Sequence, residues 1–185
     1  MRSKPILLSI LFSAFLVSVA MVNIDIHNLP FKSNYSSLSE DTQRQVNCLA
    51  ENIYFEAGHE PLEGKKAVAF VTINRVLTGN YAPTICDVVY QKKGKTCQFS
   101  WYCDTKFTNK RLTIKESNLY NEIRDLAVHM VLNYERLEDV TYGSTYYHAD
   151  YVRPNWTKLD KVEQIGRHIF YRSKNDEINK NRNFI

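Results

Sequence analysis

Cys48-Leu-Ala-Glu-Asn-Ile-Tyr-Phe-Glu-Ala-Gly-His-Glu-Pro61 is the stretch from which the architecture of this chain is best worked out. In and just before it, apolar residues recur at the helical period and form a single stripe, made up of Val46, Leu49, Ala50, Ile53 and Ala57. Ser39 offers an N-cap followed by acidic residues, whereas Gly58 and Pro61 are residues that stop a helix. The sequence therefore predicts an amphipathic helix that begins after Ser39 and ends at Gly58.

Glu56 lies on the edge of the buried face of this helix. On a helical wheel of about 100° per residue it falls roughly 20° from Leu49. A carboxyl in that place is partly desolvated, which disfavours the anion and raises the pKa. Such a group suits general acid catalysis near neutral pH. The alternative interpretation is an ordinary solvated glutamate near a helix end.

The rest of the chain predicts further helices. A second helix is expected from Leu62 to Leu77, and its apolar residues nearly encircle it, which favours the centre of the core. Its β-branched residues leave a strand as the alternative. A short helix over 83–91, a basic loop over 92–110 and a long helix over 114–134 follow.

Beyond residue 140 the pattern changes to period two with clustered aromatic residues. Short strands are expected near 141–148 and 164–171. With 185 residues, 44% of them hydrophobic, the chain suits one domain with a sizeable core. The expected fold class is α+β, a helix-dominated single domain with a small β element near the C-terminus.

Residues 1–22 predict export. Arg2 and Lys4 precede an apolar run over 6–22, which is typical of a signal peptide or of an uncleaved membrane anchor. Ser18-Val19-Ala20 would serve as a cleavage site, and both alternatives stay open. Either one delivers the remaining chain across the cytoplasmic membrane, to the periplasm or cell envelope.

Four cysteines in an exported chain fit two disulfides. Cys97 and Cys103 are close in sequence and flank a compact loop, so they are paired first, which leaves Cys48 with Cys86. The sequence does not exclude other pairings.

Charge and composition argue against some partners. The net charge of +4 is mild, and no stretch interleaves aromatic residues with a dense basic stripe, so nucleic-acid binding is not expected. The 12 tyrosines suit a groove for sugars, although many tyrosines simply pack with the hydroxyl in water.

Other catalytic arrangements have weaker support. A two-carboxylate glycosidase needs a second acid, and spacing singles out none of the candidates, Glu60, Asp104 and Asp150. Glu60 is expected to cap the second helix or to hydrogen-bond within its turn. No metal is expected, because His59 and His148 do not form the two-histidine helical motif of zinc proteases.

Four stretches together carry a resemblance to a known family. They are Asn52-Ile-Tyr-Phe-Glu-Ala-Gly-His-Glu-Pro-Leu-Glu-Gly64, Ala67-Val-Ala-Phe-Val-Thr-Ile-Asn-Arg-Val76, Ile85-Cys-Asp-Val-Val-Tyr-Gln91 and Gln98-Phe-Ser-Trp101. In this order they resemble the SleB-type cell-wall hydrolases, over about residues 46–171. Gly58-His59 departs from the family, which usually shows Arg-Gly there.

The resemblance implies a lysozyme-like fold around a catalytic glutamate, which maps onto Glu56. It implies cleavage of peptidoglycan glycan strands between N-acetylmuramic acid and N-acetylglucosamine, by a lytic transglycosylase that needs one carboxyl and no cofactor. The alternatives are a hydrolytic muramidase that uses Glu56 with Asp104 or Asp150, and a non-catalytic peptidoglycan-binding envelope protein.

With this resemblance the chain divides into 1–22 as signal peptide or membrane anchor, 23–40 as linker, 41–172 as catalytic domain and 173–185 as mobile basic tail. Candidates for orienting the sugar and its N-acetyl group are Gln98, Ser100, Tyr147 and His148. Candidates for stacking on sugar faces are Phe99, Trp101 and Trp156, for which packing in the core is the alternative.

Overall fold

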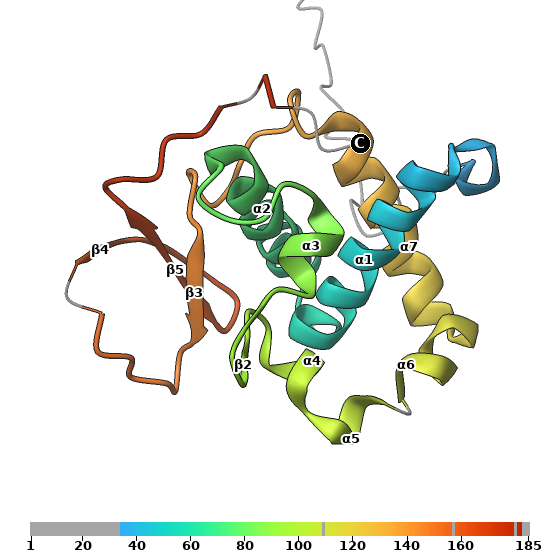
Figure 1. The fold of residues 1–185 in the computed structure, drawn as a ribbon, viewed down its shortest axis with the longest axis horizontal. Helices are drawn as coiled ribbons and strands as arrows, with labels where there is room; N and C mark the ends of the chain where they lie inside the picture. Colours follow the sequence, from blue (N-terminus) through green and yellow to red (C-terminus); the bar gives the residue numbers. More distant parts are fainter. Residues whose placement is uncertain (1–33, 109, 157, 180, 183–185) are drawn as a thin grey trace, which may run out of the picture.

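A computed structural model describes residues 34–182, apart from 109, 157 and 180 (Figure 1). The predicted signal or anchor over 1–22 lies outside these residues, as does most of the predicted linker. Within the described part, no helix is both long enough and apolar enough to cross a membrane. A short 3-10 helix, η2 (Tyr35–Ser37), leads into the first long helix.

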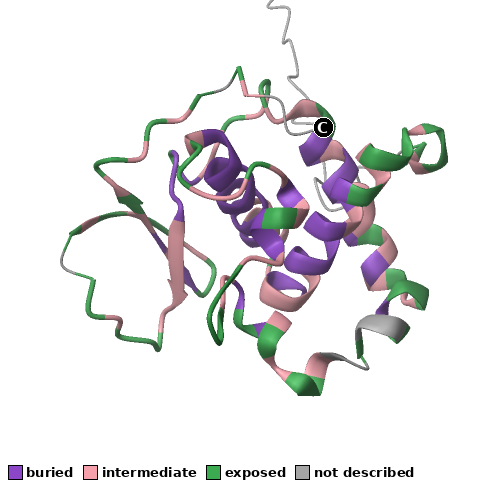
Figure 2. Cartoon of the chain, in the orientation of Figure 1, coloured by how far each residue is buried: buried purple, intermediate pink, exposed green. Residues whose placement is uncertain are grey.

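Three long helices build the core: α1 (Glu40–Ala57), α2 (Leu62–Thr78) and α7 (Asn118–Asn133). The hydroxyl of Ser39 caps α1 by accepting from the Thr42 amide at 3.2 Å, as the sequence predicts. The predicted apolar stripe of α1 is buried, and so is α2 along most of its length (Figure 2). The prediction of a central helix is therefore confirmed.

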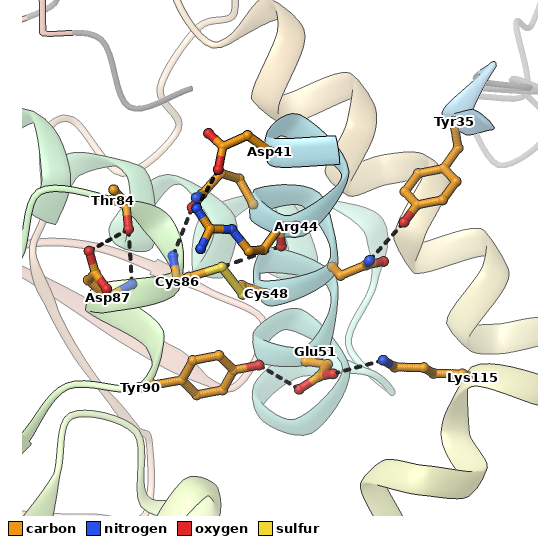
Figure 3. The surroundings of a disulfide bond; sticks show 12 residues. Tyr35, Asp41, Arg44, Cys48, Glu51, Thr84, Cys86, Asp87, Tyr90 and Lys115 are labelled. Carbon is orange, nitrogen blue, oxygen red and sulfur yellow. Dashed lines mark hydrogen bonds and ion pairs between the residues drawn. A yellow bond between two sulfur atoms is a disulfide. The ribbon is translucent and has the colours of Figure 1, made fainter. Parts of the chain in front are cut away.

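A disulfide ties α1 to the short helix α3 (Ile85–Val89) (Figure 3). Cys48 bonds to Cys86 with 5.1 Å between their Cα atoms, and Gln45 Oε1 accepts from the Cys86 amide at 3.0 Å. The second disulfide joins Cys97 to Cys103, so both predicted pairings are confirmed.

The segment predicted as one basic loop over 92–110 contains regular structure. It forms a hairpin of β1 (Lys92–Lys93) and β2 (Thr96–Cys97), followed by the single-turn helices α4 (Ser100–Cys103), α5 (Thr105–Thr108) and α6 (Lys110–Thr113). A 3-10 turn, η3 (Ile114–Glu116), then separates these from α7, which Ser117 caps. Single turns of helix leave too short a pattern to be recognised in a sequence.

A three-stranded antiparallel sheet follows the helices. Its strands, β3 (Tyr146–Ala149), β4 (Leu159–Ile165) and β5 (His168–Ser173), stand in the order β3-β5-β4. The prediction of one strand over 164–171 is wrong, because the chain reverses at Gly166-Arg167 with Gly166 at a φ of +57°. A β-carbon on Gly166 would collide with the Glu60 carboxylate.

The two faces of this sheet have different surroundings. Phe170 is fully buried against Ala67 and Val71 of α2, so one face packs on the helical layer. The opposite face carries Tyr146, His148 and Tyr171, and we call it the outer face. After β5 the chain returns to the helices, where the Asn179 amide donates to Leu77 O at 3.2 Å. The segment predicted as a mobile basic tail thus contacts α2 at Asn179 and packs on the core at Ile178.

Candidate active site

Glu56 lies in the last turn of α1, where the helical layer meets the three-stranded sheet. Its side chain is only partly exposed, and its Oε2 accepts a hydrogen bond of 2.9 Å from the hydroxyl of Tyr147 on β3. These residues are 91 positions apart in the chain, and the packing of the sheet against α2 brings them together. The structure therefore joins two of the residues that the sequence singled out.

The surroundings of Glu56 raise the pKa of its carboxyl above the usual 4.5. Burial is the main cause, because it penalises the anion. The hydrogen bond from Tyr147 and the positive charge of Arg75 act in the opposite direction and lower the pKa, but they do not cancel the burial. The carboxyl thus holds its proton to a higher pH than a solvated glutamate does. When the proton leaves, Tyr147 and Arg75 stabilise the carboxylate that forms.

Tyr147 is placed to act only as a hydrogen-bond donor. Burial and the neighbouring Glu56 raise its pKa well above 10.0, so the phenol stays protonated. Its ring packs against Phe170 at 5.7 Å and edge-on against His168 at 5.1 Å between centroids. These contacts fix the direction of the hydroxyl.

Arg75 of α2 is a buried cation beside this pair, with 5% of its surface exposed. Its Nε donates to Thr145 O at 2.8 Å, and its guanidinium lies 4.9 Å from the centre of the Phe99 ring. In the amide orientation that satisfies both groups, Gln98 accepts from the two terminal guanidinium nitrogens at 3.1 and 3.2 Å. Among the described residues Arg75 forms no salt bridge, so its charge is available to act on Glu56 over a longer distance.

The sequence interpretation missed Arg75, although a signal was present. It is the one charged residue in the run from Ala67 to Leu77, inside a helix that is apolar nearly all round. A buried charge is costly unless other groups compensate it, so a cation in such a helix indicates a specific site.

The loop closed by the disulfide between Cys97 and Cys103 supports the site through its described contacts. Gln98 holds Arg75, as described above. Phe99 and Trp101 are each 3% exposed and pack in the core, which is the alternative interpretation given for them. The Trp101 indole donates to Asn52 Oδ1 at 3.0 Å and its ring stacks on Phe55 at 4.6 Å. Ser100 is exposed at the start of α4.

His148 and Trp156 lie on the outer face of the sheet, while Tyr147 points to the other. His148 Nε2 lies 3.0 Å from the Tyr171 hydroxyl, and Nδ1 lies 2.8 Å from Ala149 O. Trp156 is 37% exposed and packs edge-to-face against His148 at 5.5 Å. The structure therefore groups these two residues together, separately from Glu56 and Tyr147.

The other acids near the site have structural partners. Glu51, 5% exposed in α1, accepts from the Tyr90 hydroxyl at 2.8 Å and lies 3.6 Å from Lys115 Nζ (Figure 3). Glu60 accepts from the Arg167 amide at 3.3 Å, so it anchors the β4–β5 turn. The two candidate second acids are also bound, Asp104 by the Lys106 amide and Asp150 by Arg167. Over the described ranges no three His, Cys, Asp or Glu side chains form a group that could hold a metal.

The fold is similar to that of solved bacterial proteins. The domain has the fold of the SleB catalytic domain from Bacillus cereus, with a TM-score of 0.52 at 23% identity over 70% of this chain and 91% of that one. The catalytic domain of the germination-specific lytic transglycosylase SleB from Bacillus anthracis gives 0.51 at 21% identity, over 74% and 98%. The prediction of a lysozyme-like, helix-dominated α+β fold is confirmed.

The chain belongs to the Cell Wall Hydrolase family, whose model matches residues 59–171. Glu56 thus lies three positions before the matched region. Among similar proteins are the spore cortex-lytic enzymes of Oceanobacillus iheyensis, 26% identical over 131 residues, and of Bacillus cereus, 24% identical over 131 residues. These alignments cover 70% of this chain but only 42% and 44% of the relatives, so the chain spans less than half of their length.

Proposed function

We propose that this protein cleaves the glycan strand of peptidoglycan between N-acetylmuramic acid and N-acetylglucosamine, as a lytic transglycosylase with Glu56 as the catalytic acid and base. One observation carries the proposal: a partly exposed carboxyl with a raised pKa, oriented by a phenol that can only donate. Membership in the Cell Wall Hydrolase family and the fold of the SleB catalytic domain support the choice of substrate.

In this mechanism Glu56 acts twice. The protonated carboxyl donates to the glycosidic oxygen while the bond from that oxygen to the muramoyl C1 breaks. The 6-hydroxyl of the same muramoyl residue then bonds to C1 and returns its proton to the Glu56 carboxylate. No water is consumed, and the product ends in a 1,6-anhydro sugar.

Tyr147 and Arg75 assist the step in which Glu56 becomes an anion. The hydroxyl of Tyr147 donates to the carboxylate as the proton leaves, and the buried charge of Arg75 stabilises the same anion. A transglycosylase needs one carboxyl, which agrees with the structural partners of Asp104 and Asp150. A hydrolytic muramidase would need one of them to activate water.

The test is digestion of purified peptidoglycan by the wild-type protein and by Glu56→Gln, which keeps the shape of the side chain and removes the proton. We expect the wild type to release soluble fragments and the variant to release none. Equal release by both proteins would refute the mechanism, and release by neither would favour a non-catalytic binding protein.

We also propose that the protein acts outside the cytoplasm, carried there by residues 1–22. The two disulfides support an oxidising compartment. Whether residues 1–22 are removed or remain as a membrane anchor is decided by the N-terminal sequence of the protein recovered from the cell envelope. An intact N-terminus in the membrane fraction would establish the anchor.

A further inference from the structure

Four rings form a cluster on the outer face of the sheet: Tyr146, His148, Trp156 and Tyr171. His148 stacks on Tyr171 at 5.2 Å with 26° between the ring planes. Trp156 lies 5.5 Å from each of these two rings and nearly perpendicular to both, and 5.7 Å from Tyr146. We call these residues the outer-face cluster.

Hydrogen bonds of His148 help to hold the cluster together. Both ring nitrogens of His148 have an oxygen partner, Ala149 O at 2.8 Å and the Tyr171 hydroxyl at 3.0 Å. A carbonyl oxygen can only accept, so Nδ1 donates to Ala149 O. His148 is thereby fixed in orientation, and its role in the cluster is to support neighbouring rings.

Part of this rigid cluster remains in solvent. Trp156 is 37% exposed, and Tyr151 in the same loop is 71% exposed. Large apolar side chains that stay exposed on a rigid base mark binding surfaces. The guanidinium of Arg167 lies 5.4 Å from the centre of the Tyr151 ring, and Arg153 is also exposed in this loop. The surface therefore combines open aromatic rings with two guanidinium groups, of which that of Arg167 is paired with Asp150 at 3.4 Å.

The outer-face cluster and the candidate active site lie on opposite faces of the same strand. Tyr146 and His148 flank Tyr147 on β3, which is an edge strand of the sheet. Successive side chains of a strand point to opposite faces, so Tyr147 reaches Glu56 while its two neighbours build the cluster. The edge of β3 therefore separates Glu56 from the outer-face cluster.

We propose that the outer-face cluster, with Tyr151 and Arg167, is a second binding site for the glycan strand, holding a part of the polymer that is not being cut. This inference rests on the proposed function. Pyranose rings have apolar C–H faces that pack on aromatic rings. The polymer also carries carboxylates on its lactyl groups or peptides, which suit Arg153, whose guanidinium donates to the carbonyl of Val152 at 3.0 Å and to that of Asp150. The mixture of rings and cations matches an anionic amino-sugar polymer better than a purely apolar partner.

The test separates binding from cleavage by using Glu56→Gln as the parent protein, with insoluble purified peptidoglycan as the ligand in a co-sedimentation assay. We expect Trp156→Ala in this parent to weaken binding about tenfold, as the loss of one aromatic contact implies. Trp156→Phe should retain most of the affinity, and Tyr151→Ser should weaken binding without affecting the fold, because Tyr151 is 71% exposed.

Tyr142→Ala is the matched control, because Tyr142 is a 59% exposed aromatic residue outside the cluster. It should bind as the parent does. Equal binding by Trp156→Ala, Tyr151→Ser and the parent would overturn the proposal, even if the wild type cuts peptidoglycan. If the wild type cuts nothing while these variants still lose binding, the second site stands and the proposed catalytic function fails.

Discussion

Tyr147→Phe removes a single oxygen atom from the candidate active site. That oxygen donates to Glu56 Oε2 at 2.9 Å, and Phe should keep the ring contacts with Phe170 and His168. A hydrogen bond to a charged group is worth about 1.5–3 kcal/mol. If the bond stabilises the Glu56 anion as its proton leaves, the variant should cleave about 10- to 150-fold more slowly.

The pH dependence should move as well. Tyr147 lowers the pKa of Glu56, so its loss should shift the alkaline limb of the rate profile to higher pH, since the acid then stays protonated longer. The assay is release of soluble fragments from purified peptidoglycan across a pH series. Tyr90→Phe is the control, because it deletes a 2.8 Å bond of the same type to the structural acid Glu51. An unchanged rate and profile in Tyr147→Phe, or an equal loss in Tyr90→Phe, would refute the role given to Tyr147.

Three further predictions concern stability. Glu56 has a folded pKa above its unfolded value of 4.5, so the stability contributed by its protonated form is fully present below about pH 4.5 and is lost as the pH rises through the folded pKa. Relative to wild type, Glu56→Gln should therefore gain about 1.4 kcal/mol per pH unit between these two pKa values and no more at higher pH, measured by urea unfolding. Arg75→Met should destabilise the fold by about 2–4 kcal/mol because Thr145 O and Gln98 lose their hydrogen-bond donor. Arg75→Lys should recover only part of this stability, since an ammonium cannot reproduce the contact of two guanidinium nitrogens with Gln98. Replacing Cys48 and Cys86 by Ala should lower the free energy of unfolding by about 4 kcal/mol, because this disulfide closes a loop of 38 residues. Replacing Cys97 and Cys103 should lower it by about 2 kcal/mol, because that loop has 6 residues. Thermal unfolding that ranks the two variants in the reverse order would contradict the loop-entropy reasoning.

Local patterns were sufficient to predict the long helices of the fold. The cap at Ser39, the stripe along α1 and the stop at Gly58 are interactions between residues close in sequence, which is why α1 and the position of Glu56 on its flank could be predicted. The same holds for α2 and for the disulfides, where few pairings were available. The two-residue reversal at Gly166-Arg167 was missed because aromatic and β-branched residues continue the strand pattern on either side of it.

The site could be predicted only in part, because its partners come from distant segments. The wheel placed Glu56 near the core, but the bond from Tyr147 depends on how the sheet packs against α2. Alternation along β3 turns Tyr147 inward and His148 outward, although both were predicted to orient the sugar. Phe99 and Trp101 are aromatic residues of the kind that stack on sugars, but the α4 turn directs them into the core.

The state of the Glu56 proton is the most direct test of this account. Carbon-13 NMR of the side-chain carboxyl can be followed through a pH titration of the wild type, with Glu56→Gln to assign the signal. We expect a midpoint above 4.5, moving further up in Tyr147→Phe and in Arg75→Met. A midpoint at or below 4.5 in the wild type would contradict the account, because such a carboxyl would be ionised where the enzyme needs it to donate a proton.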